Sequence, residues 1–332
     1  MVAVFVPIIV DSNDGAACAR LLVAISIRRP LGIYSAMVTR AGGGARLSAN
    51  WEGANMHIRL LTDRTGAEVT GIDLTKPVSA ADKGGLNRAF VEHSVLVIRD
   101  QTLSPPQVLT AVDLFGPVFH QHNTKFALPD CPQIHYISNQ DRFPDGNRYI
   151  PGEGWHTDHS NDTRPPKATV LHAVTLPDAG GDTQFANMAA AWAALSTTMQ
   201  ERIAGLMAIH VYQSSHSNRK LMGLSDSNKE RLPNAVLHPI ARTHPENGRT
   251  SIYINPIRIE GIVGMDHKEA LPLLDELLAH ATREEFQYRH EWRSGDLTIW
   301  DNRCLLHKAN GDYDMEQTRY LYRVMLRGDV PR

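Results

Sequence analysis

Two histidines and one aspartate are the residues in this sequence best suited to bind a metal ion. His156 and Asp158 form the only His-x-Asp segment of the chain. Side chains two residues apart on a strand point to the same side, so an imidazole nitrogen and a carboxylate oxygen can reach one ion. His307 supplies a distant third ligand. Two histidines and one carboxylate leave coordination positions open, which is typical of iron(II) oxygenases, whereas zinc usually prefers four-coordinate closure.

Other histidines near acidic residues compete with this interpretation. A bare His-x-Asp match is more often part of a surface strand or turn, so the first pair gains its weight from His307. His244-x-Glu246 lies in His-Pro-Glu-Asn-Gly, where proline and Asn-Gly indicate a turn, and we interpret it as structural. His159 should point away from the triad if the strand is regular, and we predict a structural role for it.

Two arginines follow the third proposed ligand. Arg319 and Arg323 lie four residues apart in an expected strand, so both should point to the same side. A guanidinium matches a carboxylate through two parallel hydrogen bonds, and a buried arginine is costly unless it meets an anion. The alternative is a pair of solvated surface arginines, which the spacing alone does not exclude.

Composition and charge argue against several functional classes. The 332 residues carry a formal net charge of -2 and a sequence pI near 6.8, which gives no basic field for nucleic acid or anionic lipid. Cys18, Cys131 and Cys304 are too few and too far apart for a disulfide framework or a cysteine-rich zinc site. We find neither a signal peptide nor an apolar stretch of about 20 residues. The sequence therefore predicts a cytoplasmic protein with small-molecule partners and no membrane contact.

The pattern of apolar residues predicts mostly short strands with a few helices. Expected strands are 57–61, 67–72, 94–99, 133–138, 168–176, 182–186, 286–292, 296–300 and 320–326, and expected helices are 80–92, 105–115, 187–206 and 268–280. Ser104 should cap the second helix, with two prolines in its first turn. The fold class is mainly β with helices (α+β), interpreted as a β-sandwich or jelly roll with helical insertions.

The first 55 residues differ from the rest. They contain apolar patches and a run of three glycines, without a sustained helical or strand period. We predict that residues 1–55 are an appended, poorly ordered extension, that one domain spans residues 56–332, and that Met56 is the functional start.

Five ordered motifs resemble the taurine dioxygenase and 2,4-dichlorophenoxyacetate dioxygenase family of Fe(II)/2-oxoglutarate enzymes. The resemblance covers about residues 57 to 330. The motifs are Trp155-His156-Thr157-Asp158, Gly180-Gly181-Asp182-Thr183, Thr243-His244-Pro245 with Gly248-Arg249, Trp300-Asp301-Asn302-Arg303 through His307, and Arg319 with Arg323.

This resemblance implies a double-stranded β-helix, or jelly roll, with Fe(II) held at its open end by His156, Asp158 and His307. It implies that Arg319 binds the distal carboxylate of 2-oxoglutarate, assisted by the Thr183 hydroxyl. With O2, such an enzyme hydroxylates a small organic acid and releases succinate and CO2. The presence of Asp158 favours hydroxylation over halogenation.

The resemblance also implies a substrate site, although it does not identify the substrate. Arg323 matches a residue that contacts the acid group of the substrate, and His122 resembles a substrate-side histidine. Gly152 and Lys125 replace an asparagine and a tyrosine of the taurine enzyme, which argues against taurine itself. The substrate class is a sulfonate, a sulfate ester or an aryloxyalkanoate.

Two other functions stay open at this point. One is a metal-dependent hydrolase or isomerase on a β-barrel, which would leave Arg319 and Thr183 unexplained. The other is a catalytically inactive relative that binds without turnover. The sequence does not decide whether the chain forms a homo-oligomer.

Overall fold

The computed structural model describes residues 3–7, 23–29, 32–41, 44–51, 56–121, 123–143, 145–149, 151–217, 221 and 234–332. The protein consists mostly of strands with few helices, as the sequence predicted.

The strands are β1 (Ala3–Pro7), β2 (Val23–Arg29), β3 (Gly32–Ala41), β4 (Gly44–Trp51), β5 (His57–Leu60), β6 (Ala67–Thr70), β7 (Val95–Ile98), β8 (His135–Ser138), β9 (Ala168–Thr175), β10 (Thr183–Asn187), β11 (Met207–His210), β12 (Val236–Pro239), β13 (Ala241–Thr243), β14 (Thr250–Ile252), β15 (Ile259–Ile262), β16 (Gln287–His290), β17 (Leu297–Asp301), β18 (Leu305–Ala309) and β19 (Tyr320–Leu326). The helices are α1 (Ala80–His93), α2 (Pro105–Asp113), α3 (Met188–Ala193), α4 (Thr197–Ile203) and α6 (His267–Ala281), with a 3₁₀ turn, η1, at Glu284–Phe286.

One large sheet runs through the molecule in the order β1-β2-β3-β4-β5-β6-β7-β17-β9-β19-β8. Its strand pairs are antiparallel except β6 and β7, which are parallel. A smaller sheet has the order β16-β10-β18. In the large sheet, the late strands β17 and β19 lie on either side of β9, and in the smaller sheet β16 and β18 flank β10.

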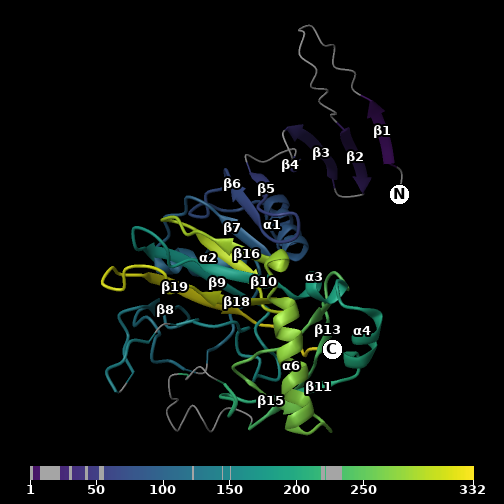
Figure 1. Ribbon diagram of the computed structural model, residues 1–332. Helices are drawn as coiled ribbons and strands as arrows, with labels where there is room; N and C mark the ends of the chain where they lie inside the picture. Colours follow the sequence, from purple (N-terminus) through teal and green to yellow (C-terminus); the bar gives the residue numbers. More distant parts are fainter. Residues whose placement is uncertain are drawn as a thin grey trace.

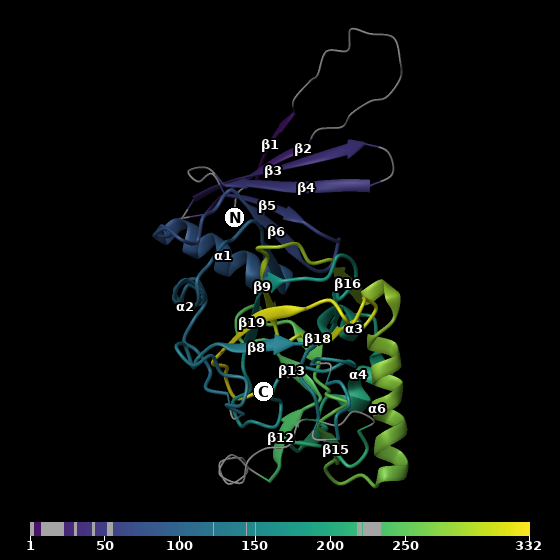
Figure 2. The ribbon, with the colours of Figure 1, turned by 90° about the vertical axis from the view of Figure 1, so that its left-hand side faces the viewer.

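Helices α1 and α2 cover one face of the large sheet (Figure 2). The Ser79 hydroxyl accepts a hydrogen bond from Asp82 N at the start of α1, and Gln107 Oε1 accepts one from Ser104 N at the start of α2. Both contacts satisfy backbone groups that a helix end leaves open. Leu86 and Phe90 of α1 are buried against the sheet.

The opposite face of the large sheet packs on the smaller sheet. Leu171 of β9 and Trp300 of β17 belong to one buried cluster with Phe185 of β10 and Leu305 of β18. The Phe185 and Trp300 rings meet edge to face with centroids 5.5 Å apart. The two sheets thus form facing layers, and α6 lies on the far side of the smaller sheet from α1 and α2 (Figures 1 and 2).

Several elements differ from the sequence expectation. The single helical stretch predicted for 187–206 is two helices, α3 and α4, which begin after the separate caps Asn187 and Ser196. Short strands β11 to β15 and β18 were not predicted. His156 lies in an isolated bridge and Asp158 in a turn, so the regular strand expected there is wrong.

The N-terminal stretch is only partly described. Strands β1 to β4 fall within residues 1–55, and β4 pairs with β5. The other residues of this stretch lie outside the described residues. The assignment of residues 1–55 as a poorly ordered extension stays a prediction. Among the described residues, no helix has the length and apolar character that crossing a bilayer requires.

Buried histidines predict how stability depends on pH. His135 is 3% exposed on β8, and burial together with the nearby Arg323 lowers its pKa to about 3 from an ordinary value of 6.5. Below that ordinary value the unfolded chain takes up a proton that the folded chain does not bind. Stability should therefore fall as pH drops from about 6.5 toward 3. In thermal melts, the loss of Tm from about pH 7.5 to about pH 5.5 should be smaller in His135→Gln than in wild type. His57→Gln, at an exposed position, is the control, and an unchanged loss in His135→Gln would contradict the assignment.

Candidate metal centre

Backbone pairing brings the two histidines together. His156 N donates to His307 O at 3.0 Å, and His307 N donates to His156 O at 2.8 Å. This bridge joins the loop before β9 to strand β18 of the smaller sheet. The two imidazole centroids are 4.2 Å apart. Residues separated by half the chain are therefore held side by side by main-chain contacts.

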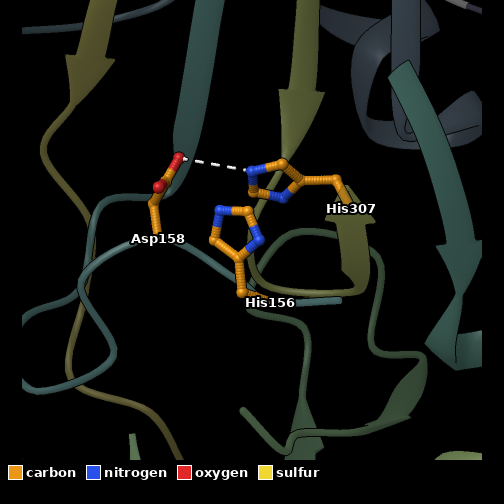
Figure 3. Close-up of side chains that lie close together, drawn as sticks. All are labelled: His156, Asp158 and His307. Carbon is orange, nitrogen blue, oxygen red and sulfur yellow. Dashed lines mark ion pairs between the residues drawn. The ribbon is translucent and has the colours of Figure 1, made fainter. Parts of the chain in front are cut away.

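Asp158 completes the cluster. One ligand atom from each of His156, Asp158 and His307 lies within 4.8 Å of the others. His307 Nε2 is 3.7 Å from Asp158 Oδ2 (Figure 3). Asp158 and His307 are buried, and His156 is half-buried. The structure thus brings together the three side chains that the sequence singled out as ligands.

Hydrogen bonds orient two of these side chains for metal binding. His156 Nδ1 lies 2.9 Å from Gly154 O. A carbonyl only accepts, so Nδ1 carries the proton and Nε2 presents its lone pair. Thr169 Oγ1 donates to Asp158 Oδ2 at 2.6 Å, and Asn302 Nδ2 donates to Thr169 Oγ1 at 2.9 Å. The carboxylate therefore has a fixed orientation.

The charge of Asp158 suits a cation. Burial alone would raise the pKa of this carboxyl, but His307, Arg323, His156 and His159 hold it well below its usual range. The carboxyl is thus ionised at neutral pH. Two imidazoles and one carboxylate form a donor set that suits first-row divalent metals such as iron, and no described cation fills the space between them. The site fits Fe(II).

A second cluster has similar residue types but different chemistry. His244, Asp301 and Cys304 also place possible ligand atoms within 4.8 Å of one another, all buried. Arg303 donates to both oxygens of Asp301, at 2.8 and 2.6 Å, and to Glu246 at 2.6 Å. Burial raises the pKa of the Cys304 thiol to about 12. A guanidinium already neutralises this carboxylate, in agreement with the structural role expected for His244-x-Glu246.

Arg319 directly precedes β19 and is 4% exposed. Its Nε donates to Gly181 O at 2.8 Å, and burial lowers its pKa to about 10. No carboxylate among the described residues is within ion-pair distance of it. Gly181 has φ +71°, and a Cβ there would lie 3.1 Å from Arg319 Cδ. The absence of a side chain at this position lets the arginine pass.

Thr183 begins β10 and is buried. It lies two residues after Gly181, whose carbonyl accepts the hydrogen bond from Arg319. Trp292 Nε1 donates to Thr183 Oγ1 at 3.0 Å. Because this oxygen accepts from the indole, the hydroxyl proton is directed elsewhere. Trp292 is a positioning residue that sequence reasoning missed, since no local pattern links it to Thr183.

Arg323 lies on β19 four residues beyond Arg319. Its Nη2 donates to Gln121 Oε1. Its charge contributes to the low pKa of Asp158, so it is close to the proposed metal site. His122, the other residue predicted to bind substrate, lies outside the described residues.

One pocket contains these groups. His156, Asp158, His307, Thr183, Arg319 and Arg323 line it, together with Gln121, Asn123, Phe126, Ile137, Tyr149, Pro151, Gly152, His159, Leu171, Tyr212, Leu221, Ile257, Arg258, Trp300 and Ala309. The expectation that His159 points away from the triad is wrong: it lines the pocket, because its backbone turns with φ 44° and does not continue a strand. Its structural role stays a prediction.

Comparisons with known proteins agree with this geometry. Residues 57–325 match the family model described as taurine catabolism dioxygenase TauD, TfdA family. The chain is 34% identical over 278 residues to an alpha-ketoglutarate-dependent 2,4-dichlorophenoxyacetate dioxygenase of Cupriavidus pinatubonensis, covering 80% of this chain and 95% of that protein. It is 30% identical to an alpha-ketoglutarate-dependent sulfate ester dioxygenase of Pseudomonas putida, covering 83% and 91%. The crystal structure of AAD-2 in complex with Mn(II) and N-oxalylglycine is 29% identical, with a TM-score of 0.71, and the match covers 83% of this chain and 98% of that one.

The hydrogen bond from Thr169 to Asp158 yields a test of the metal site. Thr169→Val keeps the side-chain shape and removes the donor, so the carboxylate loses its fixed orientation. Loss of such a supporting contact typically weakens metal binding by about 10- to 100-fold. Anaerobic calorimetry with Fe(II) measures the effect. Thr175→Val, at the exposed end of the same strand, is the control and should bind Fe(II) as wild type does. Equal affinity in both variants would contradict the assignment.

Proposed function

Because the chain belongs to the taurine catabolism dioxygenase family (TauD, TfdA), we propose that His156, Asp158 and His307 hold Fe(II) for a 2-oxoglutarate-dependent dioxygenase reaction. 2-Oxoglutarate, also called alpha-ketoglutarate, and O2 are the co-substrates. The primary substrate is a small organic acid, which is hydroxylated with release of succinate and CO2.

One observation carries this proposal. The three-residue donor set and the buried, unpaired charge of Arg319 line the same pocket. A buried guanidinium without a carboxylate partner is costly, and a dicarboxylate that bridges metal and arginine removes that cost. A hydrolase or isomerase at the same ligands would give Arg319 no anion to bind.

Arg319 and Thr183 form the binding site for the distal carboxylate of 2-oxoglutarate. The Arg319 Nε bond to Gly181 O fixes the guanidinium plane, and Trp292 leaves the Thr183 hydroxyl free to donate. Charged hydrogen bonds of this kind are the strong ones in proteins. The similar AAD-2 structure is a complex with N-oxalylglycine, a dicarboxylic acid of similar length to 2-oxoglutarate. This similarity supports the assignment.

Bound iron, 2-oxoglutarate and O2 together supply an oxidant that can replace a C–H bond of the substrate by C–OH. The protein supplies orientation and electrostatics. Arg323 holds the acid group of the substrate, and His122 is a further proposed contact. Arg319 and Arg323 lie four residues apart, which corresponds to about 13 Å of extended backbone, so each guanidinium can take a different anion.

Relatives of this chain act, by name, on 2,4-dichlorophenoxyacetate and on sulfate esters. We infer the same broad class here: sulfonates, sulfate esters or aryloxyalkanoates. We also infer that the two facing sheets form a double-stranded β-helix, that residues 56–332 are the catalytic domain, and that residues 1–55 are an extension. A cytoplasmic location, and the absence of nucleic-acid and membrane partners, stay predictions.

Succinate release tests the reaction class. Wild-type protein with Fe(II) and 2-oxoglutarate should release succinate, and one acid from a panel of taurine, hexyl sulfate and phenoxyacetate should accelerate it. His307→Ala should abolish both iron retention and turnover because one of three ligands is lost, whereas His57→Ala, at an exposed position, should not. Turnover that survives in His307→Ala would refute the metal assignment. No succinate with any acid would favour a hydrolase, an isomerase or an inactive relative.

The two arginines should act on different ligands. Arg323→Ala should weaken binding of the accelerating acid by about 10-fold or more, the value of a lost charged hydrogen bond, with little change for 2-oxoglutarate. Arg319→Ala should do the reverse. Anaerobic titrations of each ligand measure both affinities. Equal weakening of both ligands by either substitution would reject this division.

A further inference from the structure

Gln121 lies where the proposed substrate pocket meets Arg323. Arg323 Nη2 donates to Gln121 Oε1. A guanidinium has only donors, so the amide must turn its oxygen toward the arginine. The Gln121 NH2 group is therefore fixed on the other side of the amide. The hydrogen bond from Arg323 thus fixes the direction in which the Gln121 amide can donate.

Two donors at this place, one on Gln121 and one on Arg323, have no acceptor among the residues that the structure describes. Gln121 Nε2 is buried and has no hydrogen-bond partner in the described part of the chain, and the same holds for Arg323 Nε. Buried donors are nearly always satisfied in folded proteins, and an unmade hydrogen bond there is costly. Both residues line the pocket that contains the metal ligands. A ligand in that pocket is the natural acceptor.

The acceptor is expected to be an anion and not 2-oxoglutarate. Arg323 places a positive charge beside Gln121, and both side chains line the pocket that contains the proposed metal ligands. Arg319, four residues before Arg323 in the chain, donates instead to Gly181 O. Gln121 therefore belongs to the part of the pocket that faces the primary substrate.

We propose that Gln121 is a specificity-determining residue whose amide, oriented by Arg323, donates to an oxygen of the substrate's acid group. The proposal rests on the proposed function. An oxyanion accepts from both residues at once, whereas a neutral alcohol of the same shape gains little from the charge. Gln121 therefore helps to select a carboxylate, sulfonate or sulfate ester over an uncharged analogue.

Two substitutions separate this role from simple packing. Gln121→Glu keeps the shape, still accepts from Arg323, and replaces the NH2 donors by a negative charge. Gln121→Met keeps the volume and removes all hydrogen bonds. Gln200→Glu, on α4, adds the same charge outside the pocket, where its side chain now donates to Trp192 O. The probe is whichever of taurine, hexyl sulfate and phenoxyacetate most accelerates succinate release by wild type.

For the probe acid, KM should rise about 100-fold or more in Gln121→Glu and about 10-fold in Gln121→Met, as expected from charged hydrogen bonds. The KM for 2-oxoglutarate should rise much less than the KM for the probe acid in both Gln121 variants, and Gln200→Glu should match wild type for both ligands. For phenoxyacetate against 2-phenoxyethanol, the preference for the acid should fall in Gln121→Glu.

Three outcomes would overturn the proposal. These are an unchanged KM for the probe acid in both Gln121 variants, an equal rise in the KM for 2-oxoglutarate, or a loss no greater in Gln121→Glu than in Gln121→Met. A wild type that no acid accelerates would instead contradict the proposed function, so the two failures are distinguishable. If Gln121→Glu does not fold, Gln121→Met decides alone: its KM for the probe acid should rise more than its KM for 2-oxoglutarate.

Discussion

The site depends on two main-chain hydrogen bonds between His156 and His307. They fasten an irregular loop to a strand of the smaller sheet and place the two imidazoles side by side without any contribution from the side chains. Because this pairing belongs to the backbone, it forms when the two sheets pack. Asp158, two residues along the loop, then needs only the hydroxyl of Thr169 to fix its direction. The backbone pairing and the hydrogen bond from Thr169 thus set the positions of the three proposed ligands.

The two proposed anion sites, at Arg319 and Arg323, lie in one pocket with the buried carboxylate of Asp158. Asp158 is ionised because positive groups surround it, and Arg323 is among them. Arg319 is held apart by a glycine carbonyl and has no acid partner among the described residues. Arg323 lies within β19 and Arg319 directly precedes it, so the two side chains leave the backbone at separate points. A dicarboxylate at one arginine and an acid substrate at the other would leave their reacting ends near the metal ligands.

The sequence predicted the parts of this site that lie in short motifs. The three ligands, Thr183 and both arginines line one pocket as expected. The mostly-strand fold was also predicted, because alternation of apolar residues is a local signal. The errors concern long-range contacts. Nothing near His159 indicates that its backbone turns it into the pocket, and neither Trp292 nor Gln121 shows a local pattern linking it to Thr183 or Arg323. Such contacts become visible only when the sheets are assembled.

The two histidine–carboxylate clusters of this chain show why residue type alone does not define a metal site. His244, Asp301 and Cys304 are all buried and converge as closely as the proposed ligands do. In that cluster Arg303 donates to both carboxylate oxygens and supplies the positive charge itself. At Asp158 one oxygen accepts from a neutral hydroxyl, and the nearby Arg323 donates to Gln121. The difference is whether the protein supplies its own cation at the carboxylate. Where it does, the cluster is structural; where it does not, and the space opens to a pocket, a metal ion can take that place.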